Sequence, residues 1–154
     1  MAGGVKIIDQ AVNTTGDLHV GGAIKAPKVK WDAPTSVAAG AHTMTIAEIL
    51  TGIFTSDPTA DRAWTLPTAA LAVAGVANVD VGDCIEFSVI NTGTAGADEI
   101  ITVGAGSGGS LVGSGAVLTS DPVDDAFSPG SGLFRIRFTN VTSGSEAYIA
   151  YRLA

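Results

Sequence analysis

A glycine-rich run has the residue types and spacing that come closest to a known chemical motif in this sequence. Gly104-Ala-Gly106-Ser-Gly108-Gly109 matches the G-x-G-x-x-G spacing with which dinucleotide-binding proteins approach a pyrophosphate. That function needs a helix directly after the glycines, with its N-terminus facing the phosphates. Here Ser110-Leu-Val-Gly-Ser-Gly115 follows, with two more glycines and no helical period. The sequence therefore predicts a β-turn loop at this place.

The two histidines and the cysteine lack the neighbours that catalysis or metal binding needs. His19 and His42 stand far apart, and Cys84 is the only cysteine, which excludes an intrachain disulfide. Zinc sites and catalytic triads need three or four groups that converge, and no H-E-x-x-H, C-x-x-C or G-x-S-x-G occurs. We expect a protein without enzyme activity, cofactor, metal or small-molecule substrate.

An acidic cluster and three arginines are the remaining charged candidates. Asp121, Asp124 and Asp125 fit no EF-hand spacing, so a solvated loop is favoured over a calcium site. Arg135 and Arg137 point outward from a predicted strand, with Arg152 expected beside them on the next strand. Cross-strand pairs with Glu86 or Glu146 are the favoured interpretation. Because arginine is enriched at interfaces, a subunit contact through the three arginines is the alternative.

The elements that must position these residues are short strands and two short helices. Phe134, Ile136 and Phe138 alternate with outward polar residues, which is typical of a half-buried strand. Thr45 and Glu48 have the spacing of a helix capping box. We expect helices after Thr45 and at 69–75, and strands at 53–56, 62–66, 84–91, 98–103, 116–119, 133–141 and 146–153, with Ala147, Ile149, Tyr151 and Leu153 on one face of the last. This order predicts an all-β, jelly-roll-like β-sandwich.

The composition favours an oligomer. The chain is 46% hydrophobic and only 15% charged, against about 25% charged in an average soluble domain. No apolar run is long enough to span a bilayer, and the first ten residues lack the basic and apolar regions of a signal peptide, so we expect synthesis in the cytoplasm and no membrane contact. We expect the surplus of apolar residues to be buried in a permanent oligomer, and the alternative is a surface made of small, plain residues.

The positive charge is confined to one end of the chain. All four lysines lie in the first thirty residues, so residues 1–31 carry a net charge of +2 and residues 32–154 a net charge of −9. We predict an extended N-terminal arm at 1–34 and a body at 35–154. An acidic body argues against nucleic-acid binding, which begins with phosphate neutralisation.

The end of this arm mixes charge with apolar anchors. The residues predicted to bind a partner there are Ile24, Lys25, Lys28, Val29, Lys30 and Trp31. A segment of this kind can pair with an exposed strand edge and anchor through its tryptophan. The alternative is a disordered leader that only keeps the protein soluble, although such a leader does not need Ile, Val and Trp.

Several blocks between Thr43 and Leu153 resemble small structural proteins of tailed bacteriophages and related viruses. The span from Thr43 to Leu153 covers about seventy per cent of the chain. The blocks are Thr45-Ile-Ala-Glu-Ile-Leu-Thr-Gly-Ile-Phe54, Trp64-Thr-Leu-Pro-Thr-Ala69, Val81-Gly-Asp83, Ile85-Glu-Phe-Ser-Val-Ile-Asn91 and Phe134-Arg-Ile-Arg-Phe-Thr-Asn-Val-Thr-Ser-Gly-Ser-Glu146.

The resemblance implies a homotrimer on the surface of a virion. It favours a capsid decoration (cement) protein whose arms clasp neighbouring subunits of the major capsid protein. The alternative is a receptor- or glycan-binding head domain of a tail fibre or spike, which would carry exposed aromatic residues at its loop tips. A long shaft with heptads or fibrous repeats, as a fibre would have, is missing from the sequence.

Overall fold

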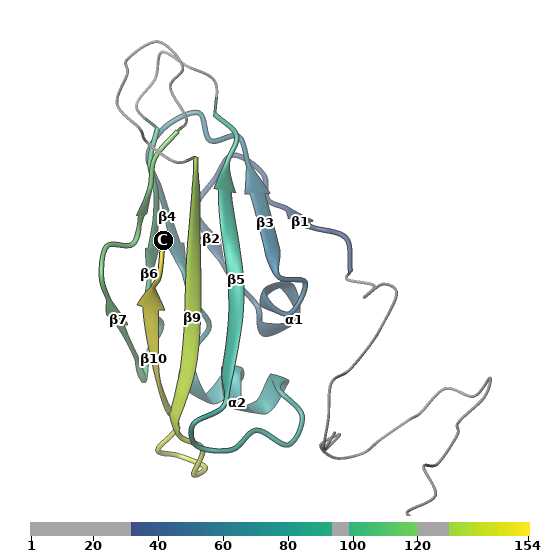
Figure 1. The fold of residues 1–154 in the computed structure, drawn as a ribbon, viewed down its shortest axis with the longest axis vertical. Coiled ribbons are helices and arrows are strands. Elements are labelled where there is room, and N and C mark those ends of the chain that lie inside the picture. The colour runs from purple at the N-terminus through teal and green to yellow at the C-terminus, as the bar shows by residue number, and fades with distance from the viewer. Residues whose placement is uncertain (1–31, 94–98, 120–129) are drawn as a thin grey trace, which may run out of the picture.

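The computed structural model describes residues 32–93, 99–119 and 130–154, which form one body of short strands (Figure 1). The elements in these ranges are β1 (Thr35–Ser36), β2 (His42–Thr43), α1 (Ile46–Ile49), β3 (Ile53–Ser56), β4 (Arg62–Thr65), α2 (Ala69–Gly75), β5 (Cys84–Asn91), β6 (Ile101–Gly104), β7 (Gly109–Val112), β8 (Ala116–Val117), β9 (Ser131–Asn140) and β10 (Ala147–Arg152).

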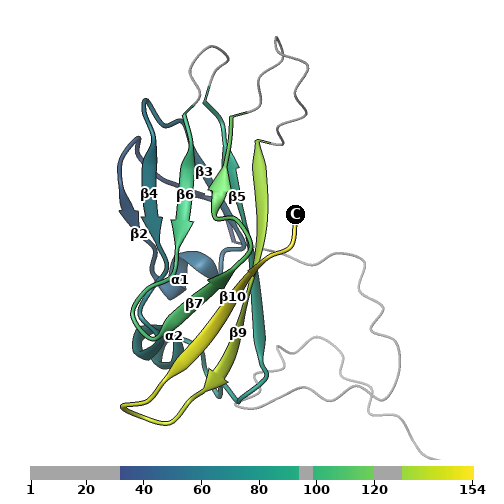
Figure 2. The same cartoon turned by 90° about the vertical axis from the view of Figure 1, so that its left-hand side faces the viewer.

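The strands form two sheets. One has the order β1-β3-β5-β9-β10-β7 and the other the order β2-β4-β6-β8. From β1 to β6 the chain alternates between the sheets, so β1, β3 and β5 pair parallel in the first and β2, β4 and β6 pair parallel in the second. Strands β5, β9 and β10 then pair antiparallel. Figure 2 shows the two sheets as separate layers, with α1 just below β2 and β4 and α2 beneath it.

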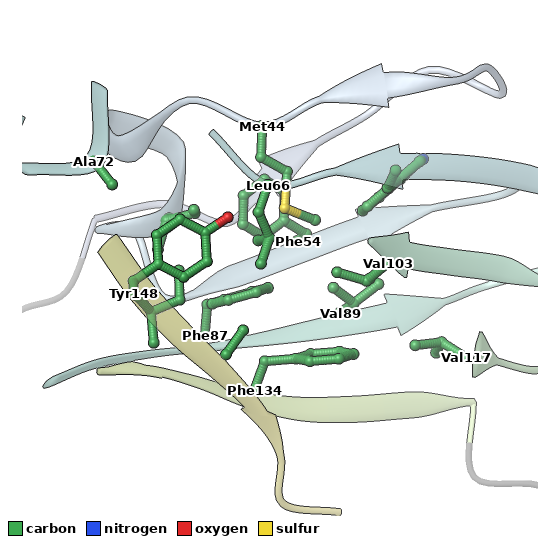
Figure 3. Packing of buried hydrophobic residues seen from close by; sticks show 14 of the residues in the cluster. Met44, Phe54, Leu66, Ala72, Phe87, Val89, Val103, Val117, Phe134 and Tyr148 are labelled. Atoms are coloured by element: carbon green, nitrogen blue, oxygen red, sulfur yellow. The ribbon is translucent and has the colours of Figure 1, made fainter. Parts of the chain in front are cut away.

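Aromatic side chains from both sheets form the centre of the core (Figure 3). Phe54 of one sheet meets Trp64 of the other edge-to-face, with ring centroids 6.0 Å apart. Phe54 also contacts Phe87 at 5.8 Å, and Phe87 stacks on Phe134 at 5.3 Å. These pairs are worth about 0.5–1.5 kcal/mol each beyond the area they bury. They join the two layers into one core.

Both helices begin at a threonine cap. The Thr45 hydroxyl accepts a hydrogen bond from the Glu48 N–H at 3.3 Å, and the Glu48 carboxylate accepts one from the Thr45 N–H at 2.7 Å. The Thr68 hydroxyl accepts a bond from the Leu71 N–H at 3.3 Å. Because helices of four and seven residues are unstable alone, packing of Ile49, Ala69 and Ala72 into the core must hold them.

The predicted mostly-β fold with two short helices is confirmed, and the bounds of β3, α2 and β5 match the expectation. The parallel pairs differ from a jelly roll, whose strands pair antiparallel. Strand β7 was not predicted, because its first residue belongs to the glycine-rich run. In β10, Ala147, Ile149 and Tyr151 share one face as predicted. The residues buried in the core are Tyr148 and Ala150, which lie on the opposite face.

Candidate functional site

The glycine-rich run is a tight turn between two strands. The Gly109 N–H donates to the Gly106 carbonyl at 3.0 Å, and β7 begins where a dinucleotide site would need a helix. A Cβ atom on Gly106 would lie 2.4 Å from the Leu66 carbonyl oxygen, so only glycine fits there. The predicted turn is confirmed, and these glycines serve backbone packing.

Tyr148 holds this turn in place. Its hydroxyl accepts a hydrogen bond from the Gly106 N–H at 2.9 Å and donates one to the Pro67 carbonyl at 3.0 Å. Burial raises the pKa of Tyr148, and the bond from Gly106 offsets only part of that effect. Sequence analysis missed this residue, because both faces of β10 are apolar.

His42 takes part in the cap of α1. Its Nε2 atom lies 3.3 Å from the Glu48 carboxylate, and its ring packs edge-on against Trp64 at 5.7 Å. Burial raises the pKa of Glu48, but the bonds from Thr45 and the nearby His42 outweigh it and leave that pKa below its usual range. The groups around His42 thus serve the fold of α1.

Cys84, the other candidate, is exposed at the start of β5.

Arg135 and Arg137 lie on the solvent side of the six-stranded sheet, which we call the outer face. The predicted cross-strand pair is confirmed for Glu86, whose carboxylate accepts a bond from the Arg135 Nε atom at 2.7 Å. The other expected partner, Glu146, accepts a bond from the Gly144 N–H instead.

The outer face also carries apolar side chains. In register across β9 and β10, Ile149 lies opposite Arg137 and Tyr151 lies opposite Arg135. Leu133 and Ile53 extend the same face, where a pocket of about 230 Å³ lies beside them. Sheet faces that look to solvent are ordinarily polar, so this face is a candidate contact surface.

Arg152 does not share the outer face with the other two arginines. It lies opposite Phe134 in the β9–β10 register, with its guanidinium 5.0 Å from that ring. It donates to the backbone carbonyls of Ala154, of Ala116 at 3.0 Å and of Ser131 at 3.2 Å. Burial lowers its pKa. Its contacts therefore tie the two sheets together, and its predicted role at a subunit interface stays a prediction.

An apolar pocket of about 340 Å³ opens near the start of both helices. We call it the helix-end pocket. Its apolar lining comes from Met44, Ile46, Leu66, Pro67 and Leu71. Leu71 is 63% exposed, the most of any large hydrophobic residue in the described ranges.

Several predicted site residues lie outside the described residues. They are the arm residues Ile24, Lys25, Lys28, Val29, Lys30 and Trp31, His19, and the acidic cluster Asp121, Asp124 and Asp125. Within 32–93, 99–119 and 130–154, no three His, Cys, Asp or Glu side chains are grouped so that they could hold a metal ion. No helix in the same ranges is long and apolar enough to cross a membrane.

Neither protein-family models, nor curated proteins, nor solved structures give a match to this chain. The geometry defines a mostly-β domain with two candidate contact surfaces, the outer face and the helix-end pocket.

Proposed function

We propose that this protein is a capsid decoration (cement) protein, which binds an assembled shell of major capsid protein as a homotrimer and stabilises it. The observation that carries the proposal is the division of charge between a basic N-terminal segment and an acidic body. The blocks between Thr43 and Leu153 that resemble phage structural proteins give it further support. It acts through contact surfaces and carries out no catalysis.

The segment from Ile24 to Trp31 supplies the shell contact in this proposal. Lys25, Lys28 and Lys30 match an acidic protein surface, and Trp31 is the type of residue that dominates binding energy at interfaces. Each arm alone needs only modest affinity. Three arms on one trimer raise the total affinity by about 10²–10⁴ through effective concentration.

The body supplies the trimer in this proposal. Two sheets with a shared core support its description as a β-sandwich, and only the pairs that β9 makes with β5 and β10 in the larger sheet agree with the antiparallel pairing of a jelly roll. Ile149, Tyr151 and Leu133 on the outer face are the apolar residues that a second copy would cover. Arg135 and Arg137 would lie at the same contact.

The test is binding of the purified protein to assembled particles that lack it. We expect the wild-type protein to sediment with the particles and to appear on the shell by electron microscopy. The triple variant Lys25→Glu, Lys28→Glu, Lys30→Glu should lose at least tenfold in affinity, because each contact with an acidic surface becomes repulsive. A variant that lacks residues 2–31 should fold, remain trimeric and no longer bind.

The control is Lys6→Glu, which changes charge outside the Ile24–Trp31 segment. Normal decoration by the truncated protein would refute the arm's role. Localisation on a tail together with binding to a glycan array would replace the proposal with a receptor-binding head domain.

A further inference from the structure

We propose that the helix-end pocket binds the indole side chain of Trp31 from the same chain. This inference goes beyond the proposed function, because it concerns the free protein and requires no shell. Trp31 immediately precedes the described body, and the pocket is an apolar site of about 340 Å³ on that body.

The size of the pocket fits one large side chain. Sites for small molecules span about 300–1,000 Å³, so this pocket lies near the lower limit. A helix or strand from a partner would need a longer groove. An aromatic side chain buries about 150–250 Å² and is therefore a suitable single occupant.

The chemistry of the lining favours an apolar occupant over a polar ligand. Met44, Ile46, Leu66 and Leu71 contribute hydrocarbon surface. Two hydroxyl groups of the lining already have partners in the helix caps: the Thr45 hydroxyl bonds with Glu48, and the Thr68 hydroxyl accepts from the Leu71 N–H. A polar ligand needs free hydrogen-bonding groups to orient it.

The chain enters the body close to this pocket. The Thr35 hydroxyl lies 3.1 Å from the Thr51 hydroxyl, so the start of β1 lies beside the end of α1. From Thr51 back to Thr45, which lines the pocket, the distance along a helical path is on the order of 9 Å. Trp31 precedes Thr35 by four residues, which span at most about 14 Å when extended.

The surface between Thr35 and the pocket carries apolar side chains, and residues 1–31 are opposite in net charge to the rest of the chain. Leu50 at the end of α1 is 47% exposed, and Ile46 at its start is half-buried against the core. Residues 1–31 carry a net charge of +2 and the remaining chain carries −9. Attraction between them favours an arm that lies on its own body over one that extends into solvent.

Tryptophan fluorescence tests the inference on the full chain. The protein has two tryptophans, Trp31 and the buried Trp64, so subtracting the spectrum of Trp31→Phe from that of the wild type isolates Trp31. We expect a blue-shifted Trp31 emission that is protected from iodide. Leu71→Asp should shift the Trp31 emission maximum to the wavelength of an indole in water and raise iodide quenching several-fold. The reason is that the substitution places a charge at the mouth of the pocket.

The matched control is Val81→Asp. Val81 is 59% exposed, close to the 63% of Leu71, and does not line the pocket. It should leave the Trp31 emission unchanged. Circular dichroism of each variant checks the fold, and both positions are exposed enough to accept a charge.

A thermal comparison gives a second measurement. Trp31→Ala should lower the melting temperature in the wild-type background and leave it unchanged in the Leu71→Asp background, since the pocket contact is then already lost. A Trp31 emission, obtained by the same subtraction, that is typical of an exposed indole would overturn the inference. Loss of the blue shift on dilution would also overturn it, because the occupant would then come from another molecule.

Discussion

At the scale of single residues, the polar groups of Tyr148 and Glu48 hold parts of the fold together. The Tyr148 hydroxyl connects the turn at Gly106 to the backbone of Pro67, and Glu48 connects the start of α1 to His42 in β2. One conservative substitution is enough to remove each of these contacts.

Tyr148→Phe removes one hydroxyl group and leaves the ring. The Gly106 N–H and the Pro67 carbonyl then lose a partner beside the core, which should lower the free energy of unfolding by about 1–3 kcal/mol. Urea denaturation measures the loss. Tyr151→Phe is the control, because no described residue bonds to the Tyr151 hydroxyl, and it should change stability by less than about 0.5 kcal/mol. Equal losses in both variants would contradict the role of Tyr148.

Glu48→Gln tests the pH dependence of the α1 cap. The folded-state pKa of Glu48 is lowered, so its carboxylate stabilises the fold above the unfolded pKa, and that contribution is lost as pH falls through the folded pKa. We expect Glu48→Gln to lower the free energy of unfolding by about 1 kcal/mol near pH 6. The difference from wild type should shrink below the ordinary glutamate pKa of about 4.3.

Urea denaturation across the acid range measures this difference. Glu146→Gln removes the same charge from the β9–β10 turn and serves as the control. A gap between wild type and Glu48→Gln that stays constant with pH would show that the carboxylate's charge has no part in the cap.

At the scale of elements, a glycine decides how closely the two helices approach. A Cβ atom on Gly75, the last residue of α2, would lie 1.8 Å from the Cγ2 atom of Ile46 and 3.0 Å from its Cβ atom. Rotation of the Ile46 side chain cannot relieve this overlap, because Cβ itself is close. Glycine at this position therefore lets α1 and α2 pack together.

Gly75→Ala should lower the free energy of unfolding by about 1–3 kcal/mol through overpacking. Helix propensity alone would favour alanine by about 1 kcal/mol, so the sign of the change identifies the clash. Combining it with Ile46→Ala should cost less than the two separate losses added together. Gly40→Ala, with nothing within 4 Å, is the control and should be nearly neutral. Urea denaturation of the wild type, Gly75→Ala, Ile46→Ala and the double variant gives the coupling energy between the two positions.

At the scale of the whole molecule, the outer face predicts the oligomeric state. We expect the wild-type protein to sediment as a trimer at micromolar concentration. Ile149→Glu places a charge between Arg137 and the β7 edge, and at an interface it should weaken association by about 2 kcal/mol, roughly 30-fold. Val81→Asp, on an exposed loop, should leave the trimer intact. A wild-type monomer would contradict both the proposed trimer and the surface assigned to it.

Local patterns predicted much of this fold. The strict alternation of Phe134, Ile136 and Phe138 identified β9 and its buried face, and the Thr45–Glu48 spacing identified the cap of α1. These signals need only neighbours a few residues away. Strands β1 and β2 are two residues long, too short to show a period, so they exist only through their pairing with β3 and β4.

The candidate site was less accessible to sequence analysis. Both sides of β10 are apolar, so alternation could not decide between Tyr148 and Tyr151 as the buried residue. Arg152 was expected beside Arg135, but its contacts with Ala116 and Ser131 draw it to the edge between the sheets. The helix-end pocket joins residues from 43 to 107, which no local pattern relates.

The sequence by itself therefore determined the longer strands, the cap at Thr45, the charge division and the lack of a recognised catalytic motif, since these depend on residue type and short spacing. Only the tertiary structure decided the parallel alternation between two sheets, the identity of the outer face and the presence of the pocket. The physical reason is that strand partners and pockets arise from contacts between residues far apart in the chain, whose energies depend on packing.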